Sequence, residues 1–117
     1  MFYLSKQLQS RLEKIKDDGT RMLVEQIVSF LWNNIGRKAR VVTIANGKDV
    51  LMKQYEKFTF TLADNNITLM ELALDSSEDD ETHIDVNNIY NVDCSSERIH
   101  IDLFDKRYVF IEFIAER

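Results

Sequence analysis

The first third of the chain has hydrophobic residues at helical spacing. Four of them recur at intervals of four, four and three positions and so share one helical face: Leu4, Leu8, Leu12 and Ile15. A second run, from Met22 to Trp32, is apolar over most of its circumference and is expected to be buried. Between the two runs, Gly19 suits a helix end and Thr20 suits an N-cap. Residues 1–36 are therefore predicted to form a helical hairpin or one long kinked helix.

From Lys38 onward, hydrophobic residues alternate with polar ones, as they do in β-strands. The dipeptide Asn46-Gly47 favours a tight hairpin turn after the first of these strands. Residues 58–74 and 99–115 share the alternation and align with each other at an offset of 41 positions. Each segment is expected to form a hairpin with a three-residue loop that starts at an aspartate. The expected registers pair the following residues: Phe60 with Met70, and Ile101 with Ile111.

These patterns predict an α+β domain with a helical element at residues 1–36 and six or seven short antiparallel strands at residues 38–115. Such a sheet is strongly twisted and can close into a small barrel or half-barrel. A chain of 117 residues has room for one domain, residues 1–117. Over residues 38–94, the order of a strand, an Asn-Gly turn, a long bent strand and a later strand resembles small barrels of the Sm-like or PUA-like kind.

Charge is distributed unevenly along the chain. Residues 1–57 carry eleven Lys or Arg and six Asp or Glu, a balance of +5, whereas residues 58–117 carry four and fourteen, a balance of −10. A chain of this kind can present a basic surface to RNA despite its acidic pI, or bind protein partners at either end. The simpler alternative is that the acidic half contains a charged, solvated loop at residues 75–85.

Six basic residues of the first half are candidates for an RNA-binding surface, because clustered cations are enough to contact phosphates. They are Arg37, Lys38, Arg40, Lys48, Lys53 and Lys57. These side chains would form one basic face if the hairpin at Gly47 folds back on itself. The alternative is that they solubilise a strand edge and discourage edge-to-edge pairing.

The last predicted hairpin carries a second candidate surface, formed by aromatic residues beside cations. Its members are His100, Phe104, Arg107, Tyr108 and Phe110. Aromatic rings on a sheet can stack unpaired RNA bases, or can form a protein-binding patch. The alternative is that these rings form a second face of the core and are covered by the helix at residues 22–32.

Both histidines of the chain lie in the tripeptide His-Ile-Asp, which raises the question of a metal site. If the isoleucines face the core, then His83, Asp85, His100 and Asp102 all point away from it. If the strands around residues 92 and 100 pair through a tight turn, opposed residue numbers sum to about 191–193, whereas His83 and His100 sum to 183. The two histidines are then too far apart along the sheet to share a metal. In the register expected for the last hairpin, with Ile101 opposite Ile111, the cross-strand neighbour of His100 is Glu112.

Several functional classes find no support in the sequence. No apolar run approaches the roughly 18 residues that cross a bilayer, and the N-terminus has no signal-peptide pattern. A single cysteine, Cys94, fits a cytoplasmic location and is expected to be a small buried residue, not a nucleophile. Three scattered glycines cannot form a phosphate-binding loop, and residues 75–81 lack the glycine of a calcium loop. No cofactor or metal is expected.

The sequence therefore favours a non-enzymatic regulatory or binding module that engages RNA through its basic first half. The alternative is a protein-binding inhibitor or adaptor, of the kind used by mobile elements or against defence systems, whose acidic loop imitates nucleic acid. An enzyme of unknown type is the third reading. A homodimer through the N-terminal helices is compatible with all three.

Overall fold

The computed structural model describes residues 6–72 and 80–115, and within them two helices precede eight strands. The helices are α1 (Lys6–Glu13) and α2 (Asp18–Trp32). The strands are β1 (Lys38–Ala45), β2 (Asp49–Tyr55), β3 (Phe58–Ala63), β4 (Asn66–Glu71), β5 (Thr82–Asp85), β6 (Ile89–Cys94), β7 (Arg98–Leu103) and β8 (Arg107–Ile114). A short 3-10 helix, η2 (Val86–Asn88), joins β5 to β6. The α+β class is confirmed, with more strands than the six or seven expected.

The two N-terminal helices form a hairpin and not one kinked helix. The Asp17 side chain accepts a hydrogen bond from the Thr20 backbone N–H at 2.7 Å, which makes Asp17 the N-cap of α2. Gly19 therefore lies in the first turn of α2, and the expectation that Thr20 caps the helix is wrong by three positions. Within the described residues, neither helix is long and apolar enough to cross a membrane.

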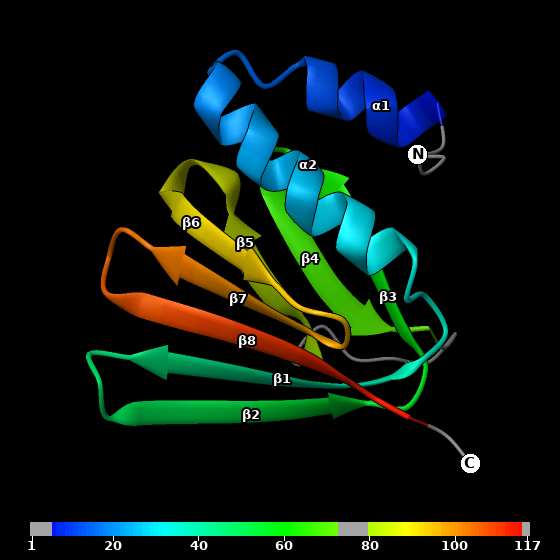
Figure 1. Cartoon of the computed structure of the whole chain (residues 1–117), viewed down its shortest axis with the longest axis vertical. Coiled ribbons are helices and arrows are strands. Elements are labelled where there is room, and N and C mark those ends of the chain that lie inside the picture. Colours follow the sequence, from blue (N-terminus) through cyan, green and yellow to red (C-terminus); the bar gives the residue numbers. More distant parts are fainter. Residues whose placement is uncertain (1–5, 73–79, 116–117) are drawn as a thin grey trace.

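The strands form two antiparallel sheets and no closed barrel (Figure 1). One sheet has five strands in the order β2-β1-β8-β7-β6, and the other has three in the order β3-β4-β5. The chain leaves the larger sheet at Tyr55 and enters the smaller one at Phe58, through two residues. No pairing between the two sheets joins them in the described residues, so the expected barrel is replaced by two separate sheets.

The β3–β4 and β7–β8 hairpins both form, but each has a pairing register that differs from the expected one because its turn differs. Asp64 and Asn65 both have positive φ, 53° and 64°, so β3 and β4 are joined by a two-residue turn of the primed kind. The loop between β7 and β8 has three residues, but it starts at Phe104 and not at Asp105. The observed pairs are therefore Phe60 with Leu69, and Ile101 with Val109.

One hydrophobic core joins the helices to both sheets. α2 and the three-stranded sheet pack on the same side of the five-stranded sheet, which we call its inner face (Figure 1). The Phe58 ring meets the Phe113 ring edge-on at 5.2 Å between centroids, and Phe30 of α2 lies 5.7 Å from Phe113. Strand alternation places every second residue of β7, the residues Ala39 and Val41 of β1, and Val109, Ile111 and Phe113 of β8 in this core.

Candidate binding face

The opposite side of the five-stranded sheet, the outer face, has no helix or strand of the described residues over it. Cross-strand pairing arranges its side chains in three rows that run across the strands. The first row is Gln54, Arg40, Glu112 and Arg98; the second is Met52, Val42, Phe110, His100 and Asp93; the third is Val50, Ile44, Tyr108, Asp102 and Asn91. The first row is thus polar throughout, whereas the second and third rows are apolar on β2, β1 and β8 and polar on β7 and β6.

The apolar part of the outer face forms one continuous patch over three adjacent strands. We call it the apolar patch, and its members are Val42, Ile44, Val50, Met52, Tyr108 and Phe110. Val50 and Met52 are 64% and 62% exposed, and Tyr108 is 36% exposed. The other three are partly buried by their neighbours in the sheet. Contiguous exposed apolar surface on a folded protein is typical of an interaction site.

A shallow hollow of about 220 Å³ lies where the apolar patch meets the charged first row. Its lining is Arg40, Val42, Arg98, Phe110 and Glu112. Arg98 pairs with Glu112 across the strands at 3.3 Å, whereas no ion pair to Arg40 is present in the described residues. The hollow therefore offers an aromatic wall together with one cation, Arg40, for which the described residues supply no counter-ion.

His100 borders the apolar patch and contacts both of its aromatic rings. Its ring stacks on Phe110 with centroids 4.4 Å apart and lies 5.9 Å from the Tyr108 ring. Its Nε2 atom is 2.8 Å from Asp102 Oδ1, but the approach lacks hydrogen-bond geometry, so the buried Nε2 has no hydrogen-bond partner among the described residues. Cross-strand neighbours of His100 are Phe110 and Asp93, so the expected pair with Glu112 is wrong because of the shifted register.

The five aromatic-face candidates separate into three places. His100, Tyr108 and Phe110 lie on the outer face, which the structure leaves open; α2, the helix expected to cover them, packs on the inner face. Phe104 is in the β7–β8 loop, 68% exposed, and its ring meets Tyr90 at 5.2 Å. Arg107 alternates toward the inner side and binds Asp105 at 2.7 Å.

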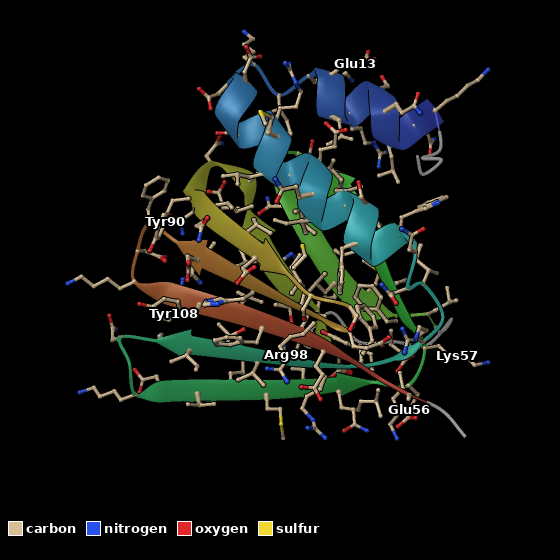
Figure 2. All side chains as sticks on the ribbon, in the orientation of Figure 1. Glu13, Glu56, Lys57, Tyr90, Arg98 and Tyr108 are labelled. Carbon is tan, nitrogen blue, oxygen red and sulfur yellow. The ribbon has the colours of Figure 1, made fainter. Side chains whose placement is uncertain are left out.

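The six basic candidates are dispersed over the five-stranded sheet and its connections. Figure 2 shows Lys57 beside Glu56 at one end of the sheet, while Tyr90 and Tyr108 lie toward the other end. Lys48 is in the β1–β2 turn, remote from Lys57 in the strand direction, and Arg40 is on the outer face. The inner-side residue Lys53 donates to the Glu81 carbonyl oxygen at 2.5 Å.

Two of these basic residues are held by carboxylates. Arg37 Nη2 lies 2.6 Å from Glu97, Nη1 donates to Asn34 at 2.7 Å, and the guanidinium carbon is 5.7 Å from the Phe113 ring centroid. Lys38 Nζ lies 3.8 Å from Glu56. Arg40 is thus the one member of this set that the structure places next to the aromatic residues of the outer face.

The twin His-Ile-Asp tripeptides lie in different sheets, β5 and β7. Their isoleucines are buried, and His83, Asp85, His100 and Asp102 point away from the core, as predicted. Asp93 opposes His100, a sum of 193, which confirms the expected register of β6 and β7. His83 instead contacts Thr68 Oγ1 at 3.1 Å and lies 3.6 Å from Glu81. The described residues contain no group of potential ligands that could hold a metal ion.

Cys94 is exposed, and the expectation that it is buried is wrong. It lines a shallow hollow of about 560 Å³ with residues of α2, among them Met22 and Phe30. Partial burial raises the pKa of the Cys94 thiol, and the neighbouring Asp93 carboxylate raises it further. A thiol with a raised pKa is mostly protonated at neutral pH, so this cysteine has none of the activation that a nucleophile needs.

Sequence reasoning included Lys53 of β2 among the basic candidates but missed the apolar β2 residues Val50 and Met52 as part of the candidate site. The signal was present, because Val42 and Ile44 precede the Asn46-Gly47 turn and Val50 and Met52 follow it with the same parity. Hairpin pairing across that turn places these four residues on one face.

No protein-family model matches the chain, and neither curated proteins nor solved structures give a significant match.

Proposed function

We propose that the protein is a non-enzymatic binding module, an adaptor or inhibitor, whose outer face docks a protein partner. The observation that carries the proposal is the apolar patch on three adjacent strands, with no described element over it. Burying such a patch in a partner removes apolar surface from water, which is the main favourable term in most protein association.

The composition of the outer face supports a protein partner over a highly charged one. Arg40 and Arg98 share a row with Glu112, and Asp93 and Asp102 lie on the far side of the patch, so two arginines stand against three carboxylates on this face. A face of this kind has little net charge to attract a polyanion. An apolar core with a polar rim is, by contrast, the usual arrangement of protein interfaces.

The hollow beside Phe110 suggests what the partner presents. An apolar side chain fits against Phe110 and Val42, and a carboxylate beside it would meet Arg40, which has no ion pair in the described residues. Aromatic and arginine side chains dominate the energy of many interfaces. We therefore expect Phe110→Ala to weaken partner binding by about 2 kcal/mol, or roughly thirtyfold.

Site-specific photo-crosslinking in the source cells tests this function. A photoreactive phenylalanine analogue at position 110 should yield a discrete crosslinked protein that resists ribonuclease, and the yield should fall when Ile44→Glu places a charge in the apolar patch. The same analogue at Lys16, an exposed residue between the helices, is the matched control and should yield none of this product. A ribonuclease-sensitive product, or equal yields from positions 110 and 16, would contradict the proposal.

RNA binding remains a second candidate, favoured by one observation on the same face. The Phe110 and Tyr108 rings lie beside Arg40 and His100, and single-stranded RNA is bound by aromatic rings flanked by cations. A titration with generic single-stranded RNA tests it, since binding should weaken with salt and fall when Arg40 and Arg98 become Ala. An RNA affinity that does not change with salt concentration, or no detectable RNA binding at low salt, would exclude RNA binding.

The acidic-loop part of the protein-binding hypothesis falls mostly on residues 75–79, which lie outside the described residues. Of the acidic residues between 75 and 85, Asp80, Glu81 and Asp85 are described, and the backbone carbonyls of Asp80 and Glu81 accept hydrogen bonds from Tyr55 and Lys53, respectively. Imitation of nucleic acid by this loop is therefore a separate proposal. Loss of partner recovery on neutralising residues 78–81, with the outer face intact, would favour it.

A further inference from the structure

β2 is an edge strand of the five-stranded sheet, and its free edge is regular and apolar. Within the described residues β2 pairs only with β1, in a continuous seven-residue register without a bulge. Three consecutive residues in its centre are more than half exposed: Val50 at 64%, Leu51 at 57% and Met52 at 62%. Native edge strands are normally protected by bulges, prolines or charges, because their unpaired backbone groups accept another strand.

The sequence of β2 is complementary to itself in the antiparallel direction. If two copies pair with Leu51 opposite Leu51, then Asp49 of each copy opposes Lys53 of the other. In the same register, Val50 opposes Met52. Opposite charges on facing strands stabilise pairing, and the two-fold symmetry repeats each favourable pair. A lysine on an edge strand normally discourages pairing with another strand. In this register, however, Lys53 of each copy faces Asp49 of the other, so its charge favours pairing.

The same register extends the outer face across the two-fold axis. An antiparallel pair of edges relates the two copies by an axis perpendicular to the sheet, so both outer faces point to the same side. Met52 of one copy then lies beside Val50 of the other, and the two apolar patches become one. The two five-stranded sheets would form a single sheet of ten strands.

We infer that a second copy of this chain pairs with β2 to form a symmetric dimer. This inference stands apart from the proposed partner, because it concerns the strand edge and not the face of the sheet. It also differs from a dimer through the N-terminal helices, which lie at the opposite end of the molecule from β2 (Figure 1). A seven-residue strand pair is a small interface, so we expect a reversible dimer, populated at about 100 µM.

Sedimentation velocity of charge variants of the full chain tests the inference. Asp49→Lys and Lys53→Asp should each weaken self-association at least about tenfold, because both symmetric pairs become repulsive. Mixing the two variants should restore a dimer, since the mixed pair again sets opposite charges against each other at both positions. Lys16→Asp, a charge change remote from β2, is the matched control and should dimerise like the unaltered chain.

The Lys53→Asp variant also loses its bond to the Glu81 carbonyl, so its fold must be checked by circular dichroism. If Lys53→Asp does not fold, Asp49→Lys and Leu51→Glu replace it in the test, because Asp49 and Leu51 are both exposed. Leu51→Glu should weaken the dimer because it places two carboxylates opposite each other at the two-fold axis. A chain that stays monomeric at about 200 µM would overturn the inference. So would a dimer that none of the β2 variants weakens, or folded charge variants that fail to associate when mixed.

Discussion

The two faces of the five-stranded sheet are built from the same strands and both carry apolar residues, yet only the inner face is buried. On β8, Val109, Ile111 and Phe113 alternate inward and are at most 2% exposed. Tyr108 and Phe110, which alternate with them along β8, point to the outer face and keep contact with solvent. The difference arises from what covers each face, because α2 and the three-stranded sheet both pack on the inner one.

The comparison separates stability from binding within one sheet. Side chains of the inner face are fixed by close packing, so their contribution is already realised in the isolated chain. Side chains of the apolar patch contribute little until another surface covers them. Substitutions one residue apart along β8 should therefore have opposite consequences for folding and for partner binding.

The largest expected effect comes from truncating the inner face. Ile111→Ala removes a fully buried side chain and should lower the free energy of unfolding by about 3 kcal/mol. Phe110→Ala, its neighbour on the other face, should cost about 1 kcal/mol, because its ring is only partly buried. Urea denaturation of both variants measures the difference, and equal losses would mean that the outer face is part of the core.

An intermediate effect is expected at the junction between the two sheets. The Tyr55 hydroxyl lies in hydrogen-bond contact with the carbonyls of Leu69 and Asp80 and with Thr82 Oγ1. Tyr55→Phe leaves these groups without that partner and should cost about 1–2 kcal/mol. Tyr108→Phe is the matched control on the outer face and should be nearly neutral. If Tyr55→Phe is also neutral, the hydroxyl does not join the sheets.

The same tyrosine gives a pH dependence. Burial raises the pKa of Tyr55 above its ordinary value of 10.0, with the Asp80, Glu81 and Glu71 carboxylates adding to the effect. A raised folded-state pKa means that its stabilisation is complete below about pH 10 and declines as the pH rises toward the folded pKa. Thermal unfolding should therefore show the unaltered chain losing stability relative to Tyr55→Phe above pH 10. A constant difference would contradict this.

The smallest effect concerns the helix that covers the inner face. The Thr20 backbone N–H hydrogen bond lowers the pKa of the Asp17 carboxyl, so its stabilisation is present above the ordinary pKa of 3.8 and lost as the pH falls through the folded value. Asp17→Asn keeps a good N-cap without a charge. Acid titration followed by circular dichroism should show the two chains converging at low pH, and a difference that grows on acidification would be contrary to this assignment.

Strand alternation predicted much of this arrangement, including the inward isoleucines of both His-Ile-Asp tripeptides and the pairing of β6 with β7. It left open whether the aromatic face of β8 is covered, since Phe110 could belong either to an exposed surface or to a second face of the core. That choice depends on the side to which Glu56 and Lys57 carry the chain when it enters the second sheet, which periodicity does not encode. The dispersal of the basic residues was not predicted either. The spacing of Lys and Arg along the strands does not reveal which carboxylates or carbonyls they contact in the folded chain.

The most direct test of the account measures Phe110→Ala twice, for unfolding and for partner binding. We predict a loss of about 1 kcal/mol in the free energy of unfolding together with a roughly thirtyfold weaker complex, using the protein recovered by crosslinking from the outer face. Ile111→Ala, compared at a temperature where it is folded, should bind that protein normally. Normal partner binding by Phe110→Ala, with a stability loss as large as that of Ile111→Ala, would contradict the account.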